Sequence, residues 1–206
     1  MNALVYDIEI RRCIDDGRSP REINSDTGRE YEYCNGWDDH FGMGIGVLCC
    51  WDFLTNRARV FSQENVAEFG ELCKQRQVVS GFNIHKYDNK ICEAYGVTIP
   101  EYQSFDIYRE VLIAAGIDPN GKTPGGRKLN DFARVNLNIQ KIEDGRNAPK
   151  MWQRGQWAQQ TTYCLDDVAI EASLFRKAIN GTLIDPFTGQ VVKLELPEVV
   201  RGLVAK

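Results

Sequence analysis

The chain has 206 residues, of which 43% are hydrophobic and 26% are charged, so it is long enough to bury a sizeable core and too hydrophobic for a disordered chain. Its net charge of −4 excludes a protein that coats nucleic acid through an overall basic surface. No segment approaches the roughly 20 apolar residues of a membrane span, and residues 1–10 lack the pattern of a signal peptide, so we expect a cytoplasmic protein.

The first half of the chain is predicted to be rich in strands. The segment ALVYDIEI, at residues 3–10, is apolar up to two acidic residues, as in a central strand whose end opens onto a site. Further strands are predicted within residues 42–53, 58–62 and 77–82. Helices are predicted over residues 66–75 and about 86–95.

The second half is predicted to be mainly helical. A short extended piece and a helix are expected within residues 104–116, a loop over 117–126, and helices over 129–139 and 161–179. The stretch 143–157 is less regular, and about 182–196 resembles a small hairpin. Strands that later alternate with helices predict an α/β protein, with a mixed β-sheet flanked by α-helices in a single domain over residues 1–206.

The seven cysteines favour neither a disulfide framework nor a zinc site. Their number is odd, Cys49 and Cys50 are adjacent, and no C-x-x-C motif occurs. We therefore expect reduced thiols, as is usual in cytoplasmic proteins.

Acidic residues occur in three defined contexts. Asp7 and Glu9 are two apart on a predicted strand, so both side chains point to one face. Asp88 follows the strand at 77–82, where helix capping is the ordinary role of such a residue. Tyr163 and Asp167 are four apart on a predicted helix and share one face. Converging carboxylates repel one another unless cations lie between them, and oxygen ligands without His or Cys favour Mg²⁺ or Mn²⁺ over zinc.

The order of these residues resembles a known family. The motifs are DIE at the end of the first strand, N-x-x-x-Y-D from Asn83 to Asp88, and Y-x-x-x-D from Tyr163 to Asp167. Together they resemble the DEDD superfamily of 3′-5′ exonucleases, in the DEDDy subgroup with Tyr in the third motif, over about residues 4–176. The resemblance implies a ribonuclease H-like fold, hydrolysis of phosphodiester bonds at the 3′ ends of single-stranded DNA or RNA, and two Mg²⁺ or Mn²⁺ ions.

The resemblance also implies roles for individual residues. The two ions would be held by Asp7, Glu9, Asp88 and Asp167. Tyr163 would orient or help deprotonate the attacking water, and Asn83 would shape the site near Asp88. Tyr87 stands where the family often has Phe, and an insert at about residues 11–41 has no counterpart in the smallest members of the family.

A locally basic segment could hold the substrate. Residues 122–154 contain eight basic and three acidic residues, a net charge of +5 within an acidic chain. Candidate phosphate contacts are Arg127, Lys128, Lys141 and Lys150, of which Lys141 rests on a looser resemblance to the helix before the third motif. Trp152 and Trp157 could stack on bases, although core packing and a solvated basic surface explain the same pattern equally well.

Three other functions are compatible with parts of the sequence. A ribonuclease H-like endonuclease would use clustered acids on the same fold, but it would not explain the second and third motifs together. A catalytically silent nucleic-acid-binding protein of the same fold would be expected to lack some of the acidic ligands, and all four are present. A non-enzymatic scaffold would leave the acids merely solvated.

Overall fold

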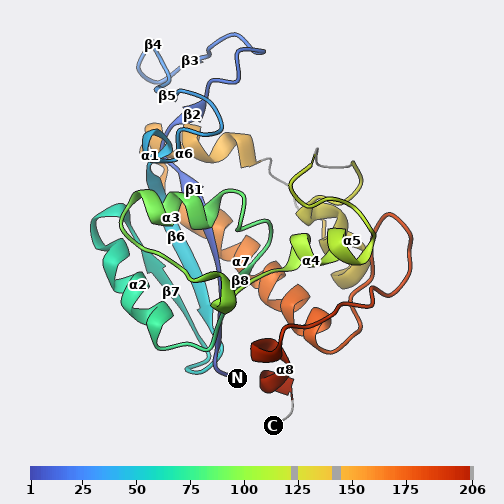
Figure 1. Cartoon of the computed structure of the whole chain (residues 1–206). Coiled ribbons are helices and arrows are strands. Elements are labelled where there is room, and N and C mark those ends of the chain that lie inside the picture. The colour runs from blue at the N-terminus through green and yellow to red at the C-terminus, as the bar shows by residue number, and fades with distance from the viewer. Residues whose placement is uncertain (122–124, 141–144, 205–206) are drawn as a thin grey trace.

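The computed structural model describes residues 1–121, 125–140 and 145–204, and its centre is a five-stranded mixed sheet (Figure 1). The strands in the order in which they lie side by side are β7 (Arg57–Phe61), β6 (Ile45–Asp52), β1 (Ala3–Ile10), β8 (Val78–Gly81) and β9 (Ser104–Asp106). On one side β6 and β7 continue the sheet in antiparallel pairs, and on the other side β8 and β9 continue it in parallel pairs. This is the arrangement of a ribonuclease H-like sheet, so the predicted fold class is confirmed.

Alternation along β1 separates the two faces of the sheet. Ala3 and Val5 pack in the hydrophobic cluster formed with α4 (Ile107–Ala114), α5 (Leu129–Leu137), α7 (Trp157–Ile179) and α8 (Glu198–Val204). Leu4, Tyr6 and Ile8 pack on the other face against α2 (Val66–Lys74) and α3 (Asp88–Ala94). Because successive side chains of a strand point to opposite faces, Asp7 and Glu9 lie on the face that α7 covers.

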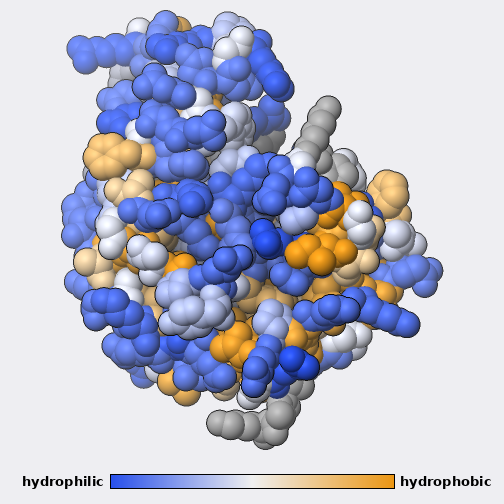
Figure 2. All heavy atoms as spheres, viewed as in Figure 1, coloured by the Kyte–Doolittle hydropathy of each residue, from blue (hydrophilic) through white to orange (hydrophobic). Residues whose placement is uncertain are grey.

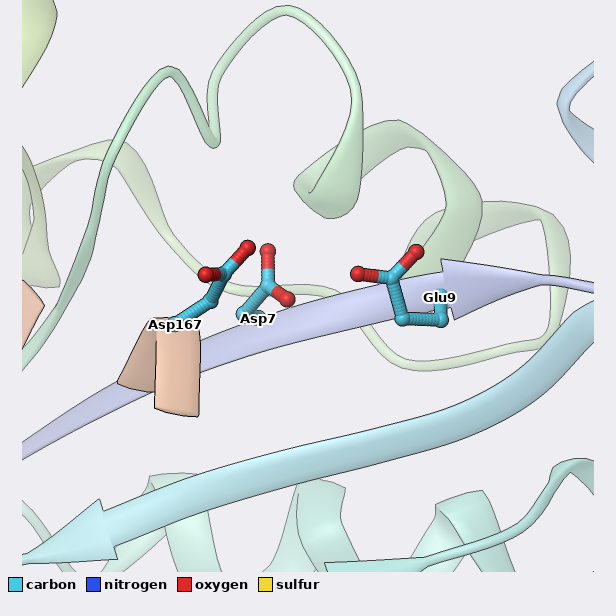
Figure 3. A group of neighbouring side chains, drawn as sticks. All are labelled: Asp7, Glu9 and Asp167. Atoms are coloured by element: carbon cyan, nitrogen blue, oxygen red, sulfur yellow. The ribbon is translucent and has the colours of Figure 1, made fainter. Parts of the chain in front are cut away.

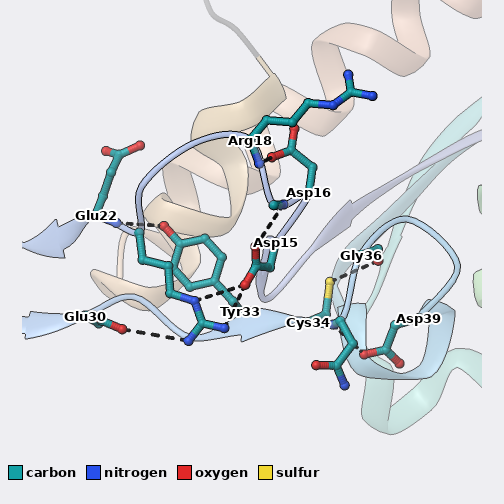
Figure 4. Close-up of polar contacts among 12 residues, drawn as sticks. Asp15, Asp16, Arg18, Glu22, Glu30, Tyr33, Cys34, Gly36 and Asp39 are labelled. Atoms are coloured by element: carbon teal, nitrogen blue, oxygen red, sulfur yellow. Dashed lines mark hydrogen bonds and ion pairs between the residues drawn. The ribbon is translucent and has the colours of Figure 1, made fainter.

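The insert forms a small substructure at one end of the sheet, at the top of Figure 1. It contains the parallel pair β2 (Cys13–Ile14) and β5 (Tyr33–Cys34), the antiparallel pair β3 (Ile23–Asn24) and β4 (Arg29–Glu30), and α1 (His40–Met43). Polar contacts help to hold it together: the backbone N–H of Glu22 donates to the Tyr33 hydroxyl at 2.9 Å (Figure 4), and Arg21 pairs with Asp15 at 2.8 Å. Hydrophilic side chains cover most of its surface in the view of Figure 2.

Several contacts join the insert to the rest of the protein, and the Gln153 side chain of α6 (Ala148–Gln153) makes three of them. The Gln153 amide donates to the carbonyls of Arg11 at 3.0 Å and Glu32 at 3.1 Å, and its oxygen accepts from the Glu32 N–H at 2.7 Å. The irregular stretch expected before the long helix thus contains a helix, preceded by a single 3₁₀ turn, η3 (Gly145–Asn147).

The C-terminal segment reverses direction between Ile184 and Val191, which form an antiparallel bridge. Backbone N–H groups of Asp185 and Val192 donate to the carbonyls of Gln190 at 2.9 Å and Leu183 at 2.8 Å. The backbone N–H and C=O of Ile184 pair with the side chain of Asn136, both at 2.8 Å, and Leu194 and Leu196 pack on the hydrophobic cluster. Contacts with α5 and the core therefore hold this turn in place, and the chain continues into α8, which was not predicted from the sequence.

All seven cysteines are free and buried, in agreement with reduced core thiols. Within the described part of the chain, no helix combines the length and hydrophobicity needed to cross a membrane.

Candidate metal centre

The carboxylates of Asp7 and Glu9 meet that of Asp167 from α7. One oxygen from each of the three residues lies within 4.8 Å of the other two (Figure 3). Figure 3 shows all three side chains pointing into the space above β1. Glu9 and Asp167 are buried, at 8% and 5% exposure, and Asp7 is half-buried. Three negative charges at this range with little water are unfavourable unless a cation neutralises them.

The two adjacent aspartates of α7 lie on different faces of the helix. Asp167 is buried and joins Asp7 and Glu9, whereas its neighbour Asp166 is exposed. Adjacent residues of a helix point about 100° apart, so only one of the two can face the strand.

Close packing at the end of β1 sets the position of α7. The pairing of β1 with β6 shifts register after Glu9, and Gly46 lies at the shift. A Cβ on Gly46 would come within 2.9 Å of the Glu9 backbone carbonyl as well as 2.7 Å of the Gln160 side chain, so the close approach of the backbone favours glycine there. The buried Gln160 amide donates to the carbonyls of Ile10 and Ala148, both at 3.0 Å. This contact fixes α7 two turns before Asp167.

Cys164 makes a second contact between α7 and β1 that the sequence analysis missed. Its thiol donates to the backbone carbonyl of Asp7 at 3.4 Å and lies 3.5 Å from the Asp7 Oδ2. Burial raises the pKa of Cys164 well above its ordinary value, and the nearby Cys49 thiol and Asp7 carboxylate add to the shift. The thiol therefore stays neutral and packs beneath the acidic group as a weak donor.

Tyr163 lies one turn before Asp167 and is half-buried. Its hydroxyl is close to η3: a Cβ added to Gly145 would be 3.5 Å from the phenol oxygen. The structure therefore places the phenol beside the backbone of this 3₁₀ turn.

Asp88 approaches β1 from α3 and lies outside the group of three acids. Its Oδ1 accepts the backbone N–H of Ile8, the residue between Asp7 and Glu9, at 3.1 Å. Burial raises the pKa of Asp88 well above its ordinary range, and the charge of Asp7 raises it further. The Asp88 carboxylate is thus electrostatically linked to the acidic group, although the structure does not bring it into that group.

Asp106 organises the loop that carries Asp88. This buried carboxylate accepts the backbone N–H groups of Asn83 at 2.8 Å, His85 at 3.0 Å and Arg109 at 3.1 Å. Asn83 has a left-handed backbone, with φ of 65°, which costs free energy and needs support from its surroundings. The sequence analysis missed Asp106, although its place before an apolar helix is a helix-capping signal.

We expect Asp106→Ala to lower the free energy of unfolding by about 2–4 kcal/mol, because three backbone donors lose their acceptor and two of them support the Asn83 turn. Denaturant unfolding measures the loss. Asp118→Ala is a matched control, since Asp118 is exposed and its carboxylate, among the described residues, accepts only the Asn120 N–H at 2.9 Å. Equal stability of the two variants would mean that Asp106 makes only an ordinary turn contact.

The described candidate phosphate contacts lie in different environments. Arg127 is buried, and its Nε and Nη2 donate to the two carboxylate oxygens of Asp185 at 2.9 and 2.7 Å. This pairing neutralises Arg127 inside the protein, which contradicts a phosphate contact. Lys128 is exposed, Lys150 pairs with Glu22 at 2.6 Å, and Lys141 lies outside the described residues.

Trp152 and Trp157 form a pair at the surface, with ring centroids 5.7 Å apart. Trp157 is 59% exposed, and the Arg11 guanidinium lies 4.5 Å from the centroid of the Trp152 ring. Neither ring belongs to the hydrophobic core clusters. The pair is therefore a small aromatic cluster at the surface, and base stacking stays a prediction.

The fold is similar to part of several solved structures, among them the family B DNA polymerase from the hyperthermophilic archaeon Pyrobaculum calidifontis, with a TM-score of 0.58 and 17% sequence identity. The match covers 96% of this chain and 26% of that chain, so the protein spans about a quarter of the polymerase's length. No family model matches this sequence, and a search of curated proteins found no match. At this identity the similarity concerns the fold alone.

Proposed function

We propose that this protein is a metal-dependent 3′-5′ exonuclease that removes nucleotides from single-stranded nucleic acid. The observation that carries the proposal is the convergence of Asp7, Glu9 and Asp167 at the centre of a ribonuclease H-like sheet. The donors are all carboxylate oxygens, a set that suits Mg²⁺ or Mn²⁺ and disfavours zinc. Asp88 is the proposed fourth ligand, since its carboxylate accepts the N–H of Ile8, the residue between Asp7 and Glu9.

Two bound ions would supply the Lewis-acid chemistry of phosphodiester hydrolysis, activating water and stabilising the leaving oxygen. The protein's own part is to hold the carboxylates in place and exclude other cations. In this proposal Tyr163 positions the attacking water, because a tyrosine phenol, with an ordinary pKa of about 10, is a poor base at neutral pH. Asn83 shapes the loop before Asp88.

Nucleic acid is the proposed substrate on two grounds. The first is the set of motifs, in which Asn83, Asp88, Tyr163 and Asp167 keep the spacing of the DEDDy exonucleases. The second is the likeness of the fold to part of a DNA polymerase. An endonuclease of the same fold remains the second candidate, favoured by the acidic group alone and not by the other motifs.

Cleavage of a 5′-labelled single strand distinguishes the alternatives. We expect a ladder of products shortened from the 3′ end when the protein is incubated with DNA or RNA strands and Mg²⁺ or Mn²⁺. Internal cuts without a ladder would indicate an endonuclease. Intact strands that nevertheless bind the protein would indicate a catalytically silent binding protein.

The two neighbours Arg127 and Lys128 should differ in their effects on binding. We expect Lys128→Ala to reduce the salt dependence of single-strand binding by about one counterion while turnover at saturation is unchanged. Arg127→Ala should leave the salt dependence unchanged but destabilise the fold by about 3–5 kcal/mol, because it strands the Asp185 charge in a buried position. Binding titrations at several salt concentrations, with unfolding curves, measure both. A salt slope that changes with Arg127 and not with Lys128 would contradict this assignment.

A further inference from the structure

A pair of aromatic rings lies beside the residue that precedes Asp88. Trp37, from the insert, is 50% exposed, and its ring centroid is 5.5 Å from that of Tyr87. The two rings are inclined at 58°, so they do not form a closed stack and a ring face of Trp37 stays uncovered by its partner. An indole exposed to this degree contributes little to the core of the protein.

Two contacts and one step along the chain connect this pair to the acidic group. The Ile8 N–H, between Asp7 and Glu9, binds the carboxylate of Asp88 at 3.1 Å. Asp88 is the first residue of α3, and Tyr87 is the residue before it. Trp37 packs on Tyr87. A half-exposed indole therefore lies next to the loop that carries a proposed metal ligand.

The position of Trp37 is fixed by the local structure of the insert. Asp39 accepts the N–H groups of Asn35 and Gly42, both at 2.9 Å, and so holds the chain on each side of Trp37 into α1. Farther along, Phe41 stacks on Tyr95 at 5.2 Å, and the Tyr95 hydroxyl donates to the Phe41 carbonyl at 2.8 Å. The segment with Trp37 is thus anchored at both ends of α3, with α1 and α3 side by side (Figure 1).

From this geometry we infer that Trp37, supported by Tyr87, is a stacking subsite for an unpaired nucleobase of the single-stranded substrate, an inference that rests on the proposed function. The insert carries more acidic than basic residues between positions 11 and 41, so it does not suit a phosphate backbone. A ring face suits a base, because every base offers a π-face of its own and stacking needs no particular sequence. The insert thereby gains a role, because it supplies the exposed indole of this subsite.

Binding measured in EDTA, where we expect no cutting, tests the subsite separately from catalysis. We expect Trp37→Ala to weaken the binding of a short fluorescent single strand about tenfold, the scale of one base–aromatic stack, and Trp37→Phe to retain most of the affinity. Tyr102→Ala is the matched control, because Tyr102 is 79% exposed on η2 (Glu101–Gln103), outside the contacts described above. The same sequence is tested as DNA and as RNA, and the strand that the wild-type protein binds with higher affinity is used.

Strands with one abasic position then locate the base. For the wild-type protein one position near the 3′ end should cost as much affinity as Trp37→Ala, and in the Trp37→Ala protein the same position should no longer matter. The subsite would be overturned if Trp37→Ala bound the strand as tightly as the wild-type protein. It would also be overturned if the affinity loss of Trp37→Ala added to that of every abasic position, even in a protein that cleaves strands normally. A wild-type protein that binds no strand would overturn both the subsite and the proposed nuclease. Binding with the expected losses but without cleavage would uphold the subsite and refute only the nuclease.

Discussion

Asp167→Asn is expected to lower the rate of single-strand hydrolysis by at least about 10²-fold, the scale on which single well-placed electrostatic contacts act in catalysis. Asparagine has nearly the same shape as aspartate but lacks its charge. Asp167 is buried among Asp7 and Glu9, so its charge would act directly on the bound cations. Turnover at saturating substrate and Mg²⁺, measured on one labelled strand, gives the size of the effect.

Asp166→Asn is the matched control for this experiment. Asp166 is adjacent in sequence, carries the same group and is exposed, so its replacement should change the rate by less than about twofold, as is usual for surface substitutions. Thermal unfolding in EDTA separates catalysis from folding: removing one of three crowded charges should leave Asp167→Asn at least as stable as the wild-type protein. An inactive Asp166→Asn protein beside an active Asp167→Asn protein would show that the face of α7 toward β1 is assigned wrongly.

Removal of divalent cations is expected to abolish hydrolysis completely. Activity should vanish in EDTA and return with Mg²⁺ or Mn²⁺ but not with Ca²⁺, whose longer bonds and looser geometry do not suit a two-ion carboxylate site. A second measurement does not depend on turnover. Mn²⁺ should raise the Tm of the wild-type protein, because binding to the folded state alone stabilises it, and should raise that of Asp7→Asn much less. Full activity in the chelator would exclude the proposed chemistry.

The fold was predictable because its elements have regular patterns. The apolar run of β1 and the periodicity of α7 are local signals, and the positions of Asp7, Glu9 and Asp167 on those elements follow from spacings of two and four residues. The structure brings these three residues together, a convergence that the resemblance to the DEDDy exonucleases implied and that the spacings alone did not predict. The predicted role of Asp88 stays a prediction, since its carboxylate lies beside the group and binds β1.

What could not be predicted depends on partners far away in the sequence. Arg127 looked like a surface charge because its partner Asp185 is 58 residues further along the chain. Gln160 appears in the sequence as one polar residue of a helix, yet it is buried and bonded to Ile10, 150 residues away. Single-sequence reasoning gives the face of an element on which a residue lies, but not which distant group will neutralise or bond it.

The central position of β1 has a consequence for how the protein folds. Its first partner, β6, begins at Ile45, its parallel neighbour β8 begins at Val78, and α7 begins only at Trp157. During synthesis the apolar strand β1 is therefore made before the strands that pair with it, and its backbone N–H and C=O groups stay unpaired. Chains in this state tend to aggregate. Asp7 and Glu9 interrupt the hydrophobic run of that strand, and charges at such places oppose intermolecular pairing. The acids proposed as metal ligands would thus also protect the nascent chain, long before Asp167 exists to complete the site.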